Sequence, residues 1–429
     1  MGLFDFLLRF LLPGRRAPEH HAKGRVRFSQ REQQKPRLDP LRRDTRRREV
    51  GRSVQPPASE PLEASELPYQ FARFSSSYGL YLDLCRDGDA SRLEQFGLPV
   101  FHTPEQLADW LGLPLPTVAW LVHRFSNGDR PASDREAHYH YHWLRKRTGG
   151  FRLIEAPKQV LKSVQSAILR EILDRIPLHV GCHGFTAGRS IVTNAQPHVG
   201  SAVLVKFDLK NFYATVRFAR VVAIFRSLGY CREAAIWLGR LTTSALPVSA
   251  SYPGGEALAV LPYRHRHLPQ GAPSSPALAN LSAYGLDIRL SGLGRSFGAR
   301  YTRYGDDLTF SGPRPFVRSL RVFIPLVTQI IRSERFRVNQ KKRKVLRSNQ
   351  RQLVTGVVVN ERPNVSRKDY DRLKAILTNS IRHGPSSQNR EQHIDFAAHL
   401  RGRVAHVCQL NRARGAKLLG LYQQIDWQL

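Results

Sequence analysis

Residues 299–311 have the sequence Ala-Arg-Tyr-Thr-Arg-Tyr-Gly-Asp-Asp-Leu-Thr-Phe-Ser, with Tyr304-Gly305-Asp306-Asp307 at its centre. Short runs rich in Tyr, Thr, Leu and Phe flank the Gly-Asp-Asp triplet, which is typical of two strands joined by a tight turn. Two adjacent carboxylates at a hairpin tip repel each other. A divalent cation would offset that repulsion, because Mg²⁺ binds hard carboxylate oxygens and leaves positions for phosphate oxygens. Taken alone, the string fits a solvated Asp-rich turn equally well.

A second carboxylate, Asp208, ends an apolar run. Residues 202–207 predict a buried strand, and a turn and a helix start follow at Phe212-Tyr213. A carboxylate at the C-terminal end of a strand lies at the rim of a sheet, where a metal or phosphate can reach it. Asp208 and Asp306 are 98 residues apart. Bringing the two strand ends together would create a site for two metal ions, about 3.5–4 Å apart.

Two further segments have the composition of nucleotide-binding loops. The Gly and Pro residues of Leu268 to Asn280 shape a loop whose backbone can approach a ligand closely, and Pro276 begins a helix. Around Gly149-Gly150, basic side chains flank the turn of a predicted hairpin. A basic hairpin can close over a triphosphate, since Arg grips phosphate with two hydrogen bonds. Without its neighbours it would be only a charged hairpin.

The composition indicates a polyanionic partner. The 429-residue chain is 41% hydrophobic, which fits a globular protein of two or three domains. It carries 67 Lys and Arg against 34 Asp and Glu, a net charge of +33. Such an excess repels itself unless it meets a polyanion, of which nucleic acid is the first candidate and an anionic membrane surface the second. Four widely spaced cysteines predict neither a zinc site nor a disulfide framework and fit a reducing cytoplasm.

Residues 1–66 are predicted to form a mostly disordered basic arm. Residues 1–60 contain 15 Lys or Arg against 7 Asp or Glu and few aromatic residues, so they cannot bury enough apolar surface to order themselves. The arm would add sequence-independent phosphate contacts, or it is a solvated tail without an essential role. Its first apolar run, Leu3 to Leu12, is too short and too charged to span a bilayer, and we expect a short helix that binds a partner or docks on the core.

A small helical region is expected over residues 67–135. Thr103 and Gln106 form a capping box around Pro104, which begins a helix, and Leu115-Pro116-Thr117 begins a second one. Two short helices with a tight turn are typical of a DNA-reading helix-turn-helix. The second helix is mostly apolar, however, which favours a packing module.

The segment His138 to Trp143 alternates histidine with aromatic residues. In a strand, period two places the three histidines on one face and the tyrosines on the other. A metal site is one interpretation, but no Cys or acidic ligand is nearby. An aromatic strand that packs against RNA or against the core is therefore favoured.

The remaining segments are basic and mainly helical. Phe316 to Ile331 has helical periodicity, residues 339–344 form a dense basic turn, and Leu353 to Asn360 is a strand pair or a bulged strand around Gly356. The preceding run of residues 241–267 has the composition of a loop insertion. From Glu361 to the end there are 12 Lys or Arg against 6 Asp or Glu. A helical bundle with one basic face suits a duplex backbone.

From about Thr103 to the C-terminus, the sequence resembles a bacterial retron-type reverse transcriptase. The polymerase motifs are Phe207-Asp208 with Phe212-Tyr213, Gln270-Gly271-Ala272-Pro273 through Pro276, and Tyr304-Gly305-Asp306-Asp307. Two further strings resemble retron hallmarks, Asn194-Ala195-Gln196-Pro197-His198 and Val354-Thr355-Gly356. The family usually has Ala where this chain has Gly305, and Gly is also seen there in RNA-dependent RNA polymerases. The two hallmark strings favour a reverse transcriptase.

The resemblance implies an α+β fold, a right-hand polymerase of fingers, palm and thumb. Residues 136–355 would form the fingers and a palm of an antiparallel sheet plus helices, and residues 356–429 a helical, RNA-binding thumb. Asp208, Asp306 and Asp307 would be catalytic, and they would hold two Mg²⁺ ions with the help of the Leu209 carbonyl.

The resemblance also implies roles for residues around the carboxylates. Lys146 and Arg152 would bind the triphosphate, while Gln270 and Gly271 would shape the nucleotide pocket. Tyr213 would exclude a 2′-hydroxyl, or it is a plain core aromatic residue. Lys342 is a candidate general acid for the leaving pyrophosphate, a role that Lys341 could equally fill. The hallmark residues, predicted to bind RNA, are Asn194, His198, Val354, Thr355 and Gly356.

Partners and setting are implied as well. The enzyme would use dNTPs to copy part of a cognate structured non-coding RNA, starting from a guanosine 2′-hydroxyl to give a branched RNA–DNA product. A role in defence against phage with a separate effector protein, a cytoplasmic location in a bacterium and no membrane partner are expected. One alternative is a defence-associated or group II intron-like reverse transcriptase without branching, although the latter would need a maturase domain after the thumb. Another is a mainly structural RNA-binding subunit that sequesters an effector.

Overall fold

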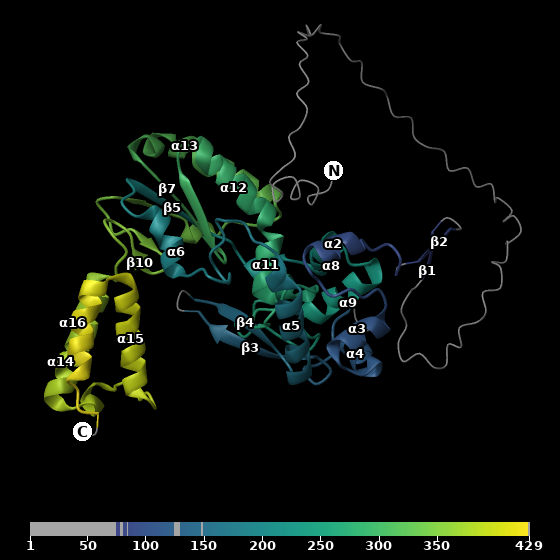
Figure 1. The fold of residues 1–429 in the computed structure, drawn as a ribbon, viewed down its shortest axis with the longest axis horizontal. Coiled ribbons are helices and arrows are strands. Elements are labelled where there is room, and N and C mark those ends of the chain that lie inside the picture. The colour runs from purple at the N-terminus through teal and green to yellow at the C-terminus, as the bar shows by residue number, and fades with distance from the viewer. Residues whose placement is uncertain (1–73, 78–79, 84, 124–128, 147–148, 428–429) are drawn as a thin grey trace, which may run out of the picture. The chain divides into compact units, whose positions relative to one another are not determined.

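Four antiparallel strands form the central sheet of the computed structural model, in the order β6-β7-β5-β8. They are β5 (Val203–Asp208), β6 (Arg300–Tyr304), β7 (Asp307–Gly312) and β8 (Lys344–Arg347). Figure 1 labels two of them, β5 and β7. The apolar β5 lies between β7 and β8 and is almost entirely buried. The predicted hairpin and the strand ending in Asp208 are thereby confirmed. The structure describes residues 74–77, 80–83, 85–123, 129–146 and 149–427, and the predicted arm of residues 1–66 lies outside them.

Helices α12 (Tyr284–Ser296) and α13 (Arg314–Ser333) pack on this sheet. Phe323 of α13 meets Phe310 of β7 edge to face, with ring centroids 4.9 Å apart, and Phe316 meets Phe323 in the same way at 4.8 Å. Each such aromatic pair contributes about 0.5–1.5 kcal/mol beyond its burial. The predicted helix from Phe316 to Ile331 is confirmed as part of α13, and its aromatic residues hold the strand that begins with Asp307.

The predicted basic hairpin consists of β3 (Tyr139–Arg145) and β4 (Phe151–Pro157), paired antiparallel along their whole length. Gly149 and Gly150 in its turn have φ of +89° and +72°, which residues with a β-carbon adopt only under strain. Along β3, Tyr139 is buried, whereas His140 and His142 are exposed. The aromatic face of this strand therefore packs on the core.

The N-terminal described region contains two short strands and three short helices: β1 (Phe74–Ser77), β2 (Leu80–Asp83), α2 (Ala90–Gln95), α3 (Pro104–Leu111) and α4 (Leu115–Leu121). The Thr103 hydroxyl accepts from the Gln106 N–H, and the Gln106 side chain accepts from the His102 N–H, so the predicted N-terminal cap of α3 is present. Leu107 and Val118 are fully buried. The apolar faces of both helices are used in packing, as the packing-module interpretation predicts.

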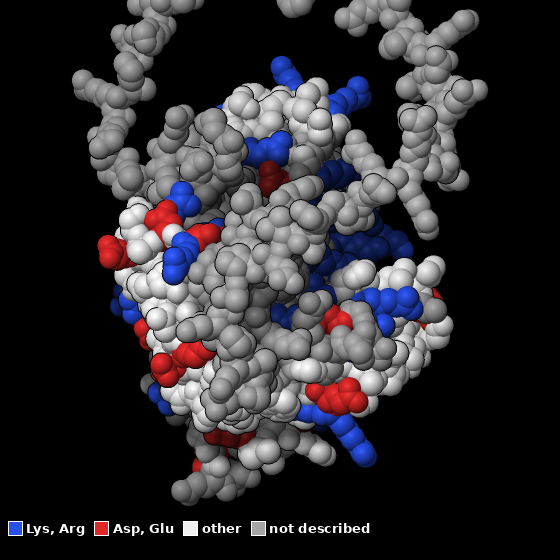
Figure 2. Space-filling view, turned by 90° about the vertical axis from the view of Figure 1, so that its right-hand side faces the viewer, with Lys and Arg blue, Asp and Glu red and all other residues white. Residues whose placement is uncertain are grey.

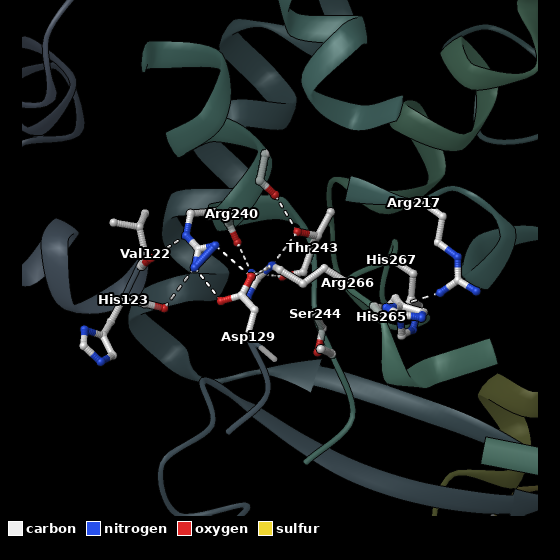
Figure 3. Close-up of polar contacts among 12 residues, drawn as sticks. Val122, His123, Asp129, Arg217, Arg240, Thr243, Ser244, His265, Arg266 and His267 are labelled. Carbon is white, nitrogen blue, oxygen red and sulfur yellow. Dashed lines mark hydrogen bonds and ion pairs between the residues drawn. The ribbon is translucent and has the colours of Figure 1, made fainter. Parts of the chain in front are cut away.

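Arg240 of α9 (Arg232–Thr242) binds the segment that follows α4 (Figure 3). Its guanidinium donates to both carboxylate oxygens of Asp129, at 2.8 and 2.6 Å, and to the Val122 carbonyl at 2.6 Å. Arg266 donates to the Arg240 and Thr243 carbonyls at 2.7 and 2.6 Å. A buried two-pronged Arg–carboxylate contact has fixed geometry, so it locks the N-terminal helices onto α9.

The remaining helices surround the sheet and the hairpin. They are α5 (Gln159–Glu171), η1 (Leu173–Arg175), α6 (Ile191–Ala195), η2 (Gln196–His198), α7 (Phe212–Thr215), α8 (Phe218–Leu228), η3 (Ala257–Val260), α10 (Leu261–Arg264), α11 (Ser275–Ser282) and η4 (Gln340–Lys342). The expected loop insertion over residues 241–267 thus contains the short helices η3 and α10.

The C-terminal bundle consists of α14 (Arg367–His383), η5 (Pro385–Gln388), α15 (Phe396–Leu410) and α16 (Arg412–Gln423). One apolar core, which includes Leu377, Leu400 and Leu418, joins the three long helices. Before them, β9 (Leu353–Val354) and β10 (Val357–Val358) form a strand pair, one of the two arrangements expected around Gly356. In the described part of the chain, no helix has the length and apolar character needed to cross a membrane.

Candidate active site

A two-residue turn presents Asp306. Strands β6 and β7 pair up to Tyr304 opposite Asp307, which leaves Gly305 and Asp306 as the turn. Gly305 has φ of +61°, as the first central residue of a type II′ turn does. A β-carbon on Gly305 would meet nothing nearer than Phe185 Cε2 at 3.4 Å. Backbone conformation, rather than lack of space, favours glycine here.

Three carboxylates meet at one end of the sheet. Asp208 lies directly opposite Asp307 in the β5–β7 pairing, and the Leu209 N–H donates to the Asp306 carbonyl at 3.0 Å. Residues directly opposite each other in an antiparallel pair have β-carbons about 4.5–5.5 Å apart. The structure thus brings together Asp208, Asp306 and Asp307, the three residues predicted to be catalytic.

Two side chains from the segment after α13 bind Asp208. Lys342 Nζ donates to Oδ2 at 2.7 Å, and Asn339 Nδ2 donates to Oδ1 at 3.0 Å. Asp208 is buried, whereas the Lys342 side chain is about half exposed. Of the two lysines that the sequence left open, Lys342 rather than Lys341 reaches the carboxylates.

The electrostatics of this rim favour a cation. Partial desolvation, followed by the Asp208 and Asp307 carboxylates, raises the pKa of Asp306 to about 6. The Asp306 side chain still reaches solvent at the turn, so a cation can approach it. The hydrogen bond to Asp208 is the largest cause that raises the pKa of Lys342.

The carboxylate oxygens at this site suit a divalent metal ion, although the side chains are not arranged around a metal ion. Within the described ranges, no three His, Cys, Asp or Glu side chains are placed to hold a metal ion. Both Asp208 oxygens instead bind Lys342 and Asn339. Hard carboxylate oxygens and concentrated negative charge suit Mg²⁺, and the Lys342 ammonium already occupies one cationic position beside Asp208.

Tyr213, Gln270 and Gly271 line one pocket of about 270 Å³ at the start of α11. Gly271 has φ of +132°, and a β-carbon there would lie 3.0 Å from the Glu155 carbonyl oxygen, so the loop needs glycine to approach β4. Burial, followed by the charge of Asp306, raises the pKa of Tyr213 to about 12. Three residues predicted to bind the nucleotide therefore share one pocket within electrostatic reach of the carboxylates.

The two basic residues predicted to bind the triphosphate lie on the β3–β4 hairpin. Lys146 directly follows β3 and is half-buried, and Arg152 on β4 is exposed. Burial, followed by the charges of Arg152 and Lys342, lowers the pKa of Lys146, while Asp208 raises it. Lys146 thus lies in a group of positive charges close to Asp208, one of the three carboxylates of the proposed catalytic rim (Asp208, Asp306 and Asp307). Figure 2 shows Lys and Arg side chains gathered in a hollow at the right of the view.

The two strings that resemble retron hallmarks contact each other. Asn194 Nδ2 donates to Thr355 Oγ1 at 3.4 Å, and Thr355 Oγ1 donates to the Ile191 carbonyl at 3.4 Å. Thr355 and Gly356 form the turn between β9 and β10 with φ of +47° and +85°. A positive φ is rare for a β-branched residue, so the contact holds Thr355 in a strained conformation.

His198 joins two strands of the sheet from inside. Its ring nitrogens bond with Ser311 Oγ at 2.7 Å and Thr302 Oγ1 at 2.8 Å. Burial lowers the pKa of His198 to about 3, so the ring is neutral near pH 7. Asn194, His198 and Val354 are all buried. Thr355 and Gly356 are more exposed than these three residues, and RNA binding by the hallmark strings stays a prediction.

A buried network beneath the catalytic turn was missed by sequence reasoning. The fully buried Arg303 forms an ion pair with Asp287, with Nη2 and Oδ2 2.7 Å apart. Arg303 Nη1 also donates to the Gly305 carbonyl at 3.1 Å and to Asn280 Oδ1 at 2.8 Å. Asn280 Nδ2 donates to the carbonyl of Gly184, where a β-carbon would lie 2.5 Å from the Gly305 nitrogen. The sequence signal that could have revealed this network is an arginine at a strand position whose side chain faces the core.

Comparison with known proteins places this site in a family. A model described as "Reverse transcriptase (RNA-dependent DNA polymerase)" matches residues 144–381. Retron Mx65 reverse transcriptase from Myxococcus xanthus is 39% identical over 331 residues, which cover 77% of this chain and 73% of that protein. Retron Mx162 reverse transcriptase from the same organism is 35% identical, covering 77% and 68%. Retron Ec86 reverse transcriptase from Escherichia coli is 28% identical, covering 78% and 93%.

Proposed function

Because the chain belongs to the retron-type reverse transcriptases and is an RNA-directed DNA polymerase, we propose that it copies part of a cognate structured non-coding RNA into single-stranded DNA. Synthesis starts from the 2′-hydroxyl of an internal guanosine and gives a branched RNA–DNA product. The observation that carries this proposal is the meeting of Asp208, Asp306 and Asp307 near the pocket of Tyr213, Gln270 and Gly271.

We assign the carboxylates to two Mg²⁺ ions. Asp208 and Asp306 would hold both ions, with Asp307 close by and the Leu209 carbonyl as a further ligand. When bound, the ions lower the pKa of the primer hydroxyl and neutralise the charge that develops on the leaving pyrophosphate. For Asp208 to take part, Lys342 has to leave the carboxylate oxygen that it now binds.

The other residues bind and orient the nucleotide. Lys146 and Arg152 hold the triphosphate, Gln270 and Gly271 shape the wall beside the incoming base, and Tyr213 packs under the sugar and excludes a 2′-hydroxyl. The primer hydroxyl loses its proton to solvent, its oxygen forms a bond to the α-phosphorus, and the bond between the α-phosphorus and the bridging oxygen breaks. Lys342 Nζ then gives a proton to the leaving pyrophosphate.

The biological setting belongs to the same proposal. The C-terminal bundle binds the cognate RNA. The complex acts in the bacterial cytoplasm, where it takes part in defence against phage together with a separate effector protein. The printed names of the relatives support the retron assignment. The basic composition supports the RNA partner.

The test is expression of the chain with its native upstream DNA, followed by extraction of nucleic acid. We expect a short DNA that reaches its final size on a gel only after both RNase and debranching treatment. Asp306→Asn should abolish this DNA and retain RNA binding, which is measured by co-purification. Loss of RNA binding in that variant would contradict the site assignment. Linear DNA alone in the wild type would contradict the branched priming.

A further inference from the structure

Three rings lie nearly parallel around the start of α15. His393 and His399 form a face-to-face stack, with centroids 3.9 Å apart and planes 17° apart. The ring of Phe396 is nearly parallel to both, at 6.3 Å from His393 and 6.2 Å from His399. All three residues are partly exposed. We refer to His393, Phe396 and His399 as the ring stack.

A pocket of about 310 Å³ between α14 and α15 is lined by the same His399. Its apolar lining is the buried Val365, Leu373 and Val407, and its polar lining is Asp369, His399, Arg403 and His406. A volume of this size is at the lower end of the range for small-ligand pockets. The pocket thus combines an apolar wall, a stacking ring and a cation.

Gly402 is an exposed residue of the pocket lining. It lines the pocket from within α15, and a β-carbon there would meet no atom within 4 Å. Glycine weakens a helix interior relative to alanine, and packing does not require it at this position.

Two basic and two acidic side chains lie at or near the pocket. Arg403 is half-buried, and its pKa is lowered first by burial and then by Arg372 on α14, with Asp369 and Glu391 acting in the opposite direction. Arg372 is exposed. Arg403 and Arg372 are the side chains at or near the pocket that could bind a phosphate through charge-assisted hydrogen bonds.

We propose that the pocket and the ring stack bind one unpaired nucleotide of an RNA. Its base stacks against His399 and extends the ring stack, and its phosphate contacts Arg403 and Arg372. Unpaired bases stack on aromatic and histidine rings regardless of sequence, whereas paired bases are not available to do so. The inference rests on the proposed RNA partner and specifies the feature that the bundle recognises, which is a bulged or looped base rather than a duplex backbone.

Binding of two fluorescein-labelled RNA hairpins to the full chain tests this site. The hairpins have the same stem, and one of them carries a single bulged adenosine. By fluorescence anisotropy we expect the bulged hairpin to bind about tenfold more tightly, the effect of one base–aromatic stack. His399→Ala should abolish this preference, and His399→Phe should keep it. Gly402→Leu, which fills the pocket, should abolish it too.

A matched control is His383→Ala, because His383 is an exposed histidine at the end of α14 outside the pocket, and it should leave the preference unchanged. Equal binding of both hairpins by the wild type, or a preference that survives both pocket variants, would overturn the proposal and leave the ring stack as a contact for protein. Extension of a DNA primer on a separate RNA template reports on the catalytic rim and should be unchanged in all pocket variants. Failure of that reaction in the wild type would instead contradict the proposed polymerase mechanism.

Discussion

Lys342 and Asp208 form an ion pair at the catalytic rim, with Lys342 Nζ 2.7 Å from Asp208 Oδ2. The ammonium neutralises one of the clustered carboxylates when no metal is present. In the proposed reaction Lys342 would give up the Asp208 oxygen to a metal, and its ammonium would then be available to protonate pyrophosphate. Lys342 therefore has one role in the metal-free site and another in the proposed reaction, and each role leads to a separate prediction.

Lys342→Met should lower the rate of nucleotide addition about 10²-fold, the usual contribution of a general acid. The same change should decrease the Mg²⁺ concentration needed for half-maximal rate, because a competing cation has been removed. Single-turnover primer extension over a range of Mg²⁺ concentrations measures both effects. Lys341→Met is the matched control and should change neither; an equal loss in that variant would show that Lys342 is not the acid.

Tyr213→Val should allow ribonucleotides into the site. Removing the ring opens space beside the sugar, and steric discrimination of this kind is worth about 10- to 200-fold. The ratio of kcat/KM for dNTP over NTP should fall by that order, while kcat for dNTP stays similar. An unchanged ratio would mean that Tyr213 is a core aromatic residue only.

Asp306→Asn should stabilise the metal-free protein at neutral pH. The pKa of Asp306 is raised to about 6, so between about pH 4 and 6 the folded state binds more protons than the unfolded one, and stability falls as pH rises through that window. The variant lacks this fall, so its Tm in EDTA should exceed the wild-type Tm at pH 7.5 and match it near pH 4. Added Mg²⁺ should remove the difference at pH 7.5. A variant less stable at pH 7.5 would contradict the carboxylate repulsion.

Gly305→Ala should cost about 1 kcal/mol in folding free energy, because alanine resists the positive φ of this turn, although the space for a methyl group exists. Gly298→Ala is the control, since Gly298 has φ of +65° and open space around its β-carbon position. Both variants should lose similar stability in urea unfolding. A slower primer extension is expected in Gly305→Ala alone.

Arg303→Lys should slow nucleotide addition while the protein stays folded. Lysine keeps the charge beside Asp287 but cannot hold Asp287, Asn280 and the Gly305 carbonyl with one planar group, so the turn shifts and kcat falls about tenfold or more. Arg303→Met should instead destabilise the fold by about 3–5 kcal/mol, because it leaves Asp287 buried and unpaired. The exposed Arg175–Glu171 pair is the control, and Arg175→Met should cost less than about 1 kcal/mol.

The features predicted correctly from the sequence are those determined by residues that are close together in the chain. The apolar run before Asp208 and the glycine of the Gly305 turn each specify a conformation through neighbouring residues alone. The resemblance to a known family predicted which segments far apart in the chain lie together. Tyr213, Gln270 and Gly271 were expected around one nucleotide, and they line one pocket.

What the sequence did not predict depends on packing between segments far apart in the chain. Arg303 lies in a segment with the sequence pattern of a strand. No residue near it in the sequence indicates that it will bond with Asp287 and Asn280. Lys341 and Lys342 are equivalent in sequence, and the direction of the chain around Asn339 selects one of them. The ring stack consists of His393, which lies before α15, and of Phe396 and His399, which lie in α15. Helical periodicity does not predict this arrangement.

The strand order also has a consequence for how the enzyme is made. Strand β8 is the last strand of the sheet to leave the ribosome, yet it pairs with β5, the first. Contacts between such distant segments form slowly, and until they form β5 presents an open edge that can pair with other chains. A nascent chain that stops before Lys342 would also leave Asp208 opposite Asp307 without its counterion. The segment that covers the open edge of β5 therefore follows shortly after the residue that supplies the counterion of Asp208.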